Sequence, residues 1–155
     1  MPSVSEVAYA AGFFDGEGHI AIAKRTARSR KKYGTYTYER YDLIVTTSQV
    51  FSGPIIWLQE RFGGRIRRSI AKRSYDRGLY ARWDWILSSQ NGATFLRAVL
   101  PYLIVKRREA EIALDFVSTL SLVRPGSKKL PAWIQEKRAK LYGEIREARR
   151  AIKIA

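Results

Sequence analysis

Residues 8–20 read AYAAGFFDGEGHI, a run of small and aromatic residues that ends in two carboxylates set among three glycines. Apolar residues recur at helical spacing on one face: Val7, Ala10, Ala11 and Phe14. Ser5 is suited to cap this helix, which we expect to begin near Glu6. Glycine is costly inside a helix, and Asp15 and Glu17 lie where the helix dipole is negative. Local stability therefore does not explain this order of residues.

A second face of the expected helix carries only small residues, Ala8, Gly12 and Gly16, spaced four apart. Such residues let two helix backbones approach closely. Because the chain carries the stretch once, the simplest partner is the same helix of a second subunit across a two-fold axis. That pairing would bring Asp15 and Glu17 beside their symmetry mates. Clustered carboxylates favour a hard cation such as Mg²⁺, and two such ions over a phosphodiester would form a cleavage site.

The charge of the chain points to a polyanionic partner. It has 29 Lys and Arg against 14 Asp and Glu, a net charge of +15 and a pI near 10.4. Nine Tyr, four Trp and the lack of a basic amphipathic anchor favour nucleic acid over a membrane surface. The absence of cysteine excludes disulfides and thiolate metal sites. We expect a reducing compartment, bacterial cytoplasm or an organelle, since neither a membrane span nor a secretion signal is evident.

The rest of the chain predicts a single α+β domain over residues 1–155. Alternating stretches predict two hairpins, one from residues 19–47 with a basic turn at 27–34, and one from 65–87. Helical patterns follow or separate them over residues 54–62, 91–100, 104–120 and from about 132 onward. The simplest packing is a four-stranded antiparallel sheet with one buried face and one basic face.

The stretch AAGFFDGEGHI resembles the signature of the LAGLIDADG homing endonucleases, which are intron- or intein-encoded DNA-cutting proteins. The resemblance covers the whole chain, and its single copy is similar to the branch that acts as homodimers. It implies an αββαββα fold whose motif helices pack at the dimer axis, with saddle-shaped sheets in the DNA major groove. It also implies Mg²⁺- or Mn²⁺-dependent hydrolysis of both strands of double-stranded DNA in a long pseudo-palindromic site.

The resemblance assigns roles to individual residues. Glu17 matches the family's metal ligand, and Gly16 would offer its backbone carbonyl to the same ion. Asp15 matches the first acid of the motif, which serves packing and capping in relatives, and a place near the metal stays open for it. Gln49, which ends TTSQ, matches a polar residue that would position the attacking water. Lys106, in PYLIVKRREA, matches a basic residue that would stabilise charge on the scissile phosphate. The implied dimer contacts are Ala8, Ala11, Gly12, Asp15 and Gly16.

Strand alternation and basic charge predict the residues that face DNA. They are His19, Arg25, Arg28, Arg30, Lys32, Tyr38, Arg40, Asp42, Thr46, Arg65, Arg67, Ser69, Lys72, Arg73, Arg77, Tyr80, Arg82, Asp84, Lys128 and Lys129. His19, the only histidine, is read as a polar strand residue near DNA, with a catalytic base as the alternative. The tryptophans are expected in the core: Trp57, Trp83, Trp85 and Trp133.

Two other functions stay open at this point. Relatives of this fold assist the excision of their own introns, so an RNA-splicing maturase is one alternative. A catalytically silent DNA-binding protein on the same scaffold is the other. Without the resemblance, Glu17 would be read as a solvated acid of a turn.

Overall fold

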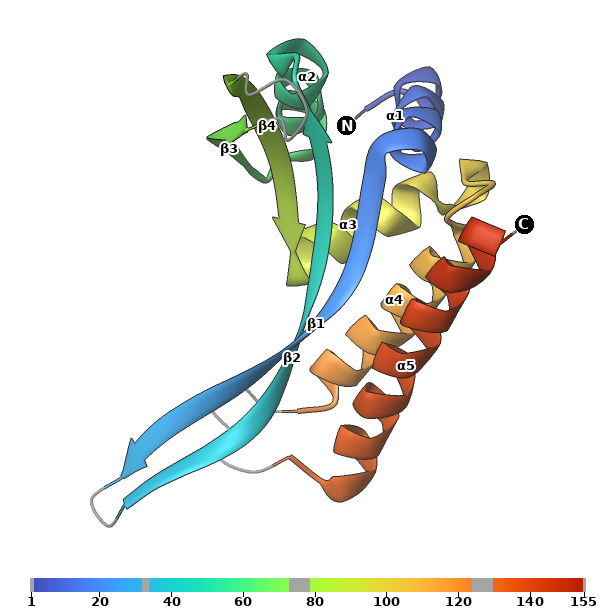
Figure 1. Cartoon of the computed structure of the whole chain (residues 1–155). Coiled ribbons are helices and arrows are strands. Elements are labelled where there is room, and N and C mark those ends of the chain that lie inside the picture. The colour runs from blue at the N-terminus through green and yellow to red at the C-terminus, as the bar shows by residue number, and fades with distance from the viewer. Residues whose placement is uncertain (1, 32–33, 73–78, 124–129, 155) are drawn as a thin grey trace.

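A computed structural model describes residues 2–31, 34–72, 79–123 and 130–154 of the chain. They form an α+β structure in which helices cover one face of a four-stranded antiparallel sheet (Figure 1). The elements in chain order are α1 (Val4–Glu17), β1 (Gly18–Lys31), β2 (Gly34–Gln49), α2 (Ser52–Phe62), β3 (Arg65–Lys72), β4 (Leu79–Ser88), α3 (Ser89–Val99), a 3₁₀ turn η1 (Leu100–Tyr102), α4 (Arg107–Ser121) and α5 (Ala132–Ile154). The predicted fold class is confirmed. None of the helices in these ranges is both long and apolar enough to cross a membrane.

Helix α1 begins earlier than the sequence predicts. Its N-cap is Ser3 and not Ser5, because Ser3 and Glu6 form a capping box. The Glu6 backbone N–H donates to Ser3 Oγ at 3.3 Å, and the Ser3 backbone N–H donates to Glu6 Oε2 at 2.7 Å. At its other end α1 passes directly into β1 at Gly18. A Cβ atom on Gly18 would lie only 2.3 Å from the Phe14 ring, so the helix and the strand meet too closely for a larger residue.

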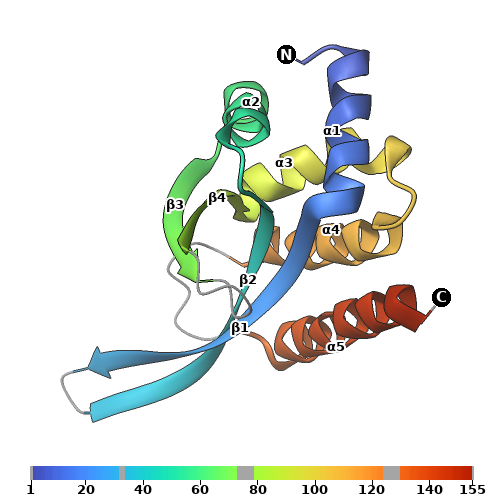
Figure 2. The ribbon, with the colours of Figure 1, turned by 45° about the horizontal axis from the view of Figure 1, so that its top comes forward.

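The sheet has the strand order β1-β2-β4-β3, and its register fixes which residues share a face. One cross-strand row on the polar face runs His19–Thr46–Ile86–Arg65. The opposite face is apolar and packs under the helices. The basic segment at 27–31, expected as a turn, instead continues β1 because the Tyr- and Thr-rich start of β2 pairs with it. The β1–β2 hairpin therefore extends beyond the helices (Figure 2), and we call its outer part, residues 26–31 and 34–39, the arm.

The core lies between the inner face of the sheet and helices α1, α3 and α4. Phe14, Phe95 and Trp85 are almost fully buried, and Phe95 packs edge-to-face against both of the other rings at 5.2 and 5.0 Å between centroids. Of the four tryptophans, Trp133 does not lie in the core. It is 56% exposed, because the buried face of α5 is the one that carries its neighbour Ile134.

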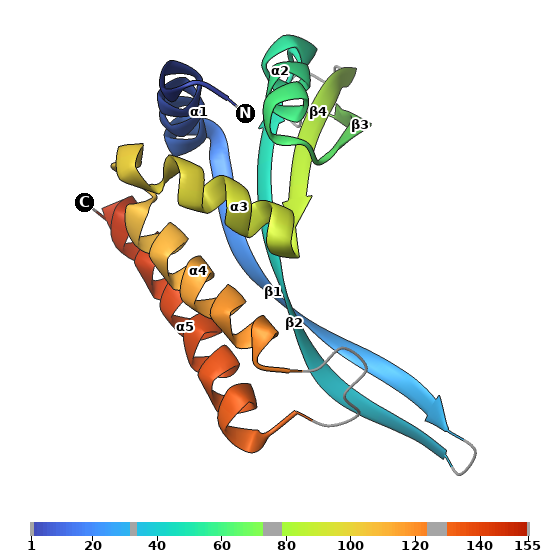
Figure 3. The same cartoon turned by 180° about the vertical axis from the view of Figure 1, so that it is seen from behind.

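Helices α4 and α5 pack side by side, as Figure 3 shows from behind. Arg138 of α5 is buried and donates to the hydroxyl and the carbonyl of Thr119, near the end of α4, at 2.9 and 3.0 Å. Desolvation lowers the pKa of this guanidinium. Arg138 therefore acts as a C-terminal cap for a neighbouring helix.

Candidate active site and nucleic-acid interface

The end of α1 is tied to the start of α4 by Asp15. Its Oδ2 accepts the backbone N–H groups of Ile104 at 2.6 Å and Val105 at 3.1 Å, and its Oδ1 accepts that of Lys106 at 2.9 Å. These three amides precede α4, which begins at Arg107 and not at 104 as the sequence predicts. Asp15 therefore caps a helix that is remote in sequence.

Glu17 and Lys106 lie at the same end of α1. The Lys106 ammonium donates to the backbone carbonyl of Asp15, which brings this cation to the negative end of the helix. Glu17 is exposed and makes no hydrogen bond or ion pair with any residue that the structure describes. Gly16, which lies between Asp15 and Glu17, is also exposed. One free carboxylate, one lysine and an exposed glycine thus lie at the end of α1 that joins the sheet.

Gln49 and His19 lie near this end of α1. Gln49 is the last residue of β2, two residues beyond Thr47, which pairs with Gly18. Its register opposite Trp83 places it on the helix-covered side of the sheet, not on the polar face. His19 lies on the polar face, and desolvation together with the positive charges of Arg149 and Lys106 holds its pKa below the usual range. A neutral imidazole is favoured at pH 7.

The residues at the end of α1 fit a divalent cation only in part. Within the described ranges, no group of three or more His, Asp or Glu could hold a metal. Both oxygens of Asp15 already accept backbone N–H groups, which leaves Glu17 as the free carboxylate. Mg²⁺ is commonly held by one or two carboxylates completed by water and substrate phosphates. One chain therefore supplies at most a partial set of ligands for such an ion.

The polar face of the sheet carries a basic groove of about 420 Å³, which we call the sheet groove. Four arginines from three strands line it: Arg25, Arg40, Arg65 and Arg67. Asp42 and Thr46 line it as well, and Arg40 donates to Asp42 at 2.9 Å. Arginine forks match the major-groove edge of guanine, and a sheet of this kind can follow a groove of duplex DNA.

Asp84 organises the arginines beside this groove. It is buried and accepts hydrogen bonds from Ser48 at 2.7 Å and from Arg67 at 2.8 Å, and Arg82 lies 2.9 Å away. Burial acts to raise the pKa of Asp84, but the bonds from Ser48, Arg67 and Arg82 outweigh it and lower the pKa. The sequence places Asp84 among the DNA contacts. In the structure its carboxylate is covered, so it holds two arginines in place instead.

The remaining predicted DNA contacts fall into three groups. Arg28 and Arg30 lie on the arm, and alternation turns them to the face opposite Arg25. Tyr38 lies on the arm, while Ser69 and Tyr80 belong to the second hairpin. The other residues fall outside the described ranges, or have a side chain outside them: Lys32, Lys72, Arg73, Arg77, Lys128 and Lys129.

The outer face of α1 is open. A Cβ atom added at Gly12 or Gly16 would meet nothing within 4 Å in this chain. Ala11 is the exception among the predicted dimer contacts. It is fully buried in the chain's own core, on the same face as Phe14, so the prediction that it contacts a partner is wrong.

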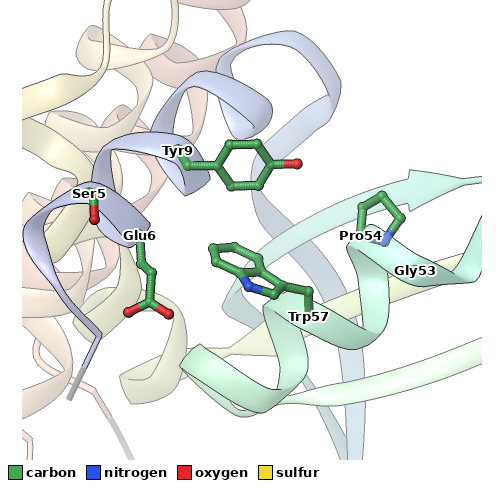
Figure 4. A pocket seen from close by; sticks show the side chains of 6 residues that line it. All are labelled: Ser5, Glu6, Tyr9, Gly53, Pro54 and Trp57. Atoms are coloured by element: carbon green, nitrogen blue, oxygen red, sulfur yellow. The ribbon is translucent and has the colours of Figure 1, made fainter.

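Near the start of α1, a pocket of about 440 Å³ lies between α1 and α2 (Figure 4). The rings of Tyr9 and Trp57 meet edge-to-face there, 5.1 Å apart, and Tyr9 is still 56% exposed. Arg61 of α2 pairs with Glu6 at 2.6 Å. The pocket is far along α1 from Glu17.

No pattern in the sequence indicates Glu109 and Arg149, which join α4, α5 and β1 next to the candidate site. Glu109 is buried in the first turn of α4, and Arg149 of α5 donates to it at 3.1 Å. Arg149 also donates to the backbone carbonyl of Ile20 on β1. Both residues belong to charged helical patterns that resemble ordinary solvated faces, and only the tertiary packing of α4, α5 and β1 distinguishes them.

Comparison with known proteins finds similar solved structures but no similar sequence family. No protein-family model and no curated protein sequence matches the chain. The solved structure of the homing endonuclease I-CvuI in complex with its target is similar, with 21% identity and a TM-score of 0.64 over 94% of this chain and 82% of that one. The archaeal intron-encoded homing endonuclease I-Vdi141I, complexed with DNA, has 17% identity and a TM-score of 0.68 over 93% and 84%.

A third similar structure is the LAGLIDADG homing endonuclease I-GzeII in complex with its DNA target, with 15% identity and a TM-score of 0.59. The match covers 88% of this chain and 43% of that one. The structure is therefore of the class in which two α-β-β units form one antiparallel sheet beneath helices. This is the fold of the LAGLIDADG homing endonucleases, as the stretch AAGFFDGEGHI predicts.

Proposed function

We propose that the protein is a homodimeric, divalent-metal-dependent, site-specific DNA endonuclease of the homing type. The observation that carries the proposal is the end of α1, where Glu17 has a free carboxylate and the Lys106 ammonium donates to the carbonyl of Asp15, two residues before it, in a chain whose sheet carries a basic groove. The similar structures of I-CvuI, I-Vdi141I and I-GzeII are complexes with DNA or a target, which supports double-stranded DNA as the substrate.

In this proposal Glu17 and the carbonyl of Gly16 would hold the cation, Mg²⁺ or Mn²⁺. The bound ion would supply Lewis-acid stabilisation of the phosphodiester. I-CvuI was solved with its own target in the presence of Ca, and with the I-CreI target, which was not cleaved, in the presence of Mg; the use of these ions supports a divalent cation. Lys106 would stabilise negative charge on the scissile phosphate, and Gln49 would orient the attacking water, although its strand register turns it away from the polar face. Asp15 would hold the start of α4, and with it Lys106, at the end of α1.

Three observations support a homodimer. The glycine face of α1 is open, and large apolar side chains of the chain are exposed: Tyr9 on α1 itself 56%, Ile104, whose N–H bonds to Asp15 of α1, 87%, and Phe51 75%. One chain holds only one free motif carboxylate. The chain also matches only 43% of I-GzeII and 45% of I-SmaMI, so each of those chains has room for two such units.

The test is the substitution Glu17→Gln, which removes the metal-binding charge and keeps the shape. Duplexes bound by the wild-type protein with Ca²⁺ are first selected from a randomised DNA pool, and cleavage is then started with Mg²⁺. We expect wild-type protein to cut both strands, and the variant to bind with unchanged affinity and not to cut. Glu60→Gln, an exposed glutamate near the end of α2, is the matched control and should cut normally. Cleavage by the Glu17 variant at the wild-type rate rejects the assignment.

The same experiment separates the two other functions. Binding of the selected duplex without cutting by wild-type protein would indicate a silent DNA-binding protein. Preferential binding of the intron RNA that carries its gene would indicate a maturase. The free carboxylate of Glu17 beside Lys106 favours the nuclease over both, because neither function requires a metal-binding acid at that position.

A further inference from the structure

A second groove lies along the outer edge of β1, and neither the motif nor the sheet groove accounts for it. We call it the α5 groove. It has a volume of about 270 Å³ and runs between residues 21–25 of β1 and the side of α5 that carries Tyr142, Arg146 and Arg149. Its floor on the polar face consists of Ala21 and Ala23, which leave the space open.

The α5 groove is strongly basic. Lys24, Arg25, Arg146 and Arg149 line it, and no acidic residue of the described ranges does. Two of these cations are neutralised elsewhere, since Lys24 pairs with Glu39 at 2.6 Å and Arg149 with Glu109 at 3.1 Å.

The other two cations have no acidic partner among the residues that the structure describes. Arg146 is exposed, donates to the neutral hydroxyl of Tyr142 at 3.1 Å and stacks over its ring at 5.3 Å. Arg25 has no carboxylate partner in the described part of the chain. Two guanidinium groups thus remain available to an anion.

The α5 groove adjoins the sheet groove, because Arg25 lines both of them. It is also bordered by backbone. β1 is the edge strand, and Arg149 reaches the outward carbonyl of Ile20. Alternation along an antiparallel strand places the N–H groups of Ile22 and Lys24 on that same edge. An anion in the α5 groove would therefore meet guanidinium and amide donors together.

We propose that the α5 groove binds the sugar–phosphate backbone of the duplex whose bases lie in the sheet groove, with Arg146 as the principal phosphate contact. This inference rests on the proposed function. The chemistry favours a phosphodiester over a base edge, because guanidinium forks bind phosphate oxygens in pairs and the alanine floor offers no group to read a base. Helix α5 thereby becomes part of the DNA-binding surface and not only a cover for the sheet.

The test uses the salt dependence of binding to one selected duplex, with Ca²⁺ present so that the DNA stays intact. Each phosphate contact adds about 0.9 to the slope of log K against log salt concentration. We expect Arg146→Ala, which removes one contact from each subunit of the proposed dimer, to reduce the slope by about 1.8, so that wild-type affinity falls about 12-fold more than that of the variant between 50 and 200 mM salt. Arg146→Lys should restore the slope, because it keeps the charge.

Arg150→Ala is the matched control, since Arg150 is an exposed arginine on the same helix that does not line the groove. It should leave the slope unchanged. Equal changes for both alanine variants, or no change for Arg146→Ala, would overturn the assignment of the α5 groove while wild-type binding and cleavage still support the proposed function. Failure of the wild-type protein to bind any duplex would overturn both.

Discussion

The two α-β-β units of the chain share a topology and differ where the helix meets the first strand. In the first unit α1 runs straight into β1 through Asp15, Gly16 and Glu17, all in helical conformation. In the second unit α2 ends before Gly63 and Gly64, whose φ angles of 71° and 90° reverse the chain into β3. The α1–β1 junction exposes the carboxylate of Glu17, and the α2–β3 junction packs against the core.

At the second junction, side chains of the core pack directly against the two glycines. Trp85 donates its indole N–H to the carbonyl of Gly63 at 2.7 Å, and a Cβ atom on Gly64 would lie 2.5 Å from Leu87. The first junction has no such cover over Gly16 and Glu17. The comparison teaches that the same connection can serve packing in one unit and leave functional groups at the surface in the other.

The largest effect on folding is expected from Gly64→Ala. The alanine would have to adopt the φ of 90° that Gly64 has. Its methyl group would lie 2.5 Å from Leu87 and 2.9 Å from the carbonyl oxygen of Ile86. We expect the free energy of unfolding to fall by roughly 2–4 kcal/mol, from backbone strain and overpacking together. Urea denaturation followed by tryptophan fluorescence measures it.

Gly12→Ala, a glycine substitution on the open face of α1 in the first unit, is the control. Nothing lies within 4 Å of the added methyl group, and alanine favours a helix by up to about 1 kcal/mol. The stability of the single chain should stay the same or rise, while self-association weakens because the open face of α1 is then less able to approach a second copy. A loss of stability equal to that of the Gly64 variant would remove the contrast between the two units.

Much of this contrast follows from the sequence, and its limits have a physical cause. The order of elements, the two hairpins and the buried alternation of Ile20 and Ile22 follow from hydrophobic periodicity, which is a local property. The motif also predicts that Glu17 and Lys106 belong to one site, and the structure places Lys106 at the end of α1. Whether these residues perform the proposed chemistry stays a prediction.

Local pattern could not reveal bonds between distant segments. Nothing near Asp15 in the sequence indicates that its partners are the amides of residues 104–106, which delay the start of α4. Asp84 and Ser48 are 36 residues apart, and Arg149 lies 129 residues from Ile20. Small residues suit a helix–helix interface and a core equally well, so composition alone does not show that Ala11 belongs to the core.

A smaller effect is expected from Asp15→Asn, which changes the acceptor of the first junction. The amide keeps one oxygen but turns an NH₂ group toward a backbone donor, so at least one of the N–H groups of residues 104–106 loses its partner. We expect a loss of roughly 1–3 kcal/mol in unfolding free energy, with faster hydrogen exchange confined at first to these amides.

Asp115→Asn provides the comparison for that variant, because Asp115 belongs to α4 itself and its exposed carboxylate accepts from Lys137 at 2.8 Å and from Ser118 at 3.4 Å. Its loss should cost less than about 1 kcal/mol. Unchanged exchange at residues 104–106 in the Asp15 variant would show that this carboxylate does not hold the start of α4.

The smallest effect concerns Glu6, the carboxylate that joins the two units at the opposite end of α1. The Ser3 backbone N–H, the Arg61 guanidinium and the Ser3 hydroxyl lower the pKa of Glu6 from 4.5 to about 2. Because the pKa is lower in the folded chain, this contribution to stability is complete above about pH 4.5 and is lost as the pH falls toward 2.

Glu6→Gln removes that titration. Urea midpoints of wild type and variant, measured between pH 6 and pH 2.5, should therefore differ most at the upper end and converge as the pH falls. Glu60→Gln, an exposed acid on α2, should show no such convergence. A difference between wild type and the Glu6 variant that stays constant across this range would mean that the capping box and the Arg61 pair do not favour the ionised carboxylate. The link between the two units would then rest on the contact of Tyr9 with Trp57.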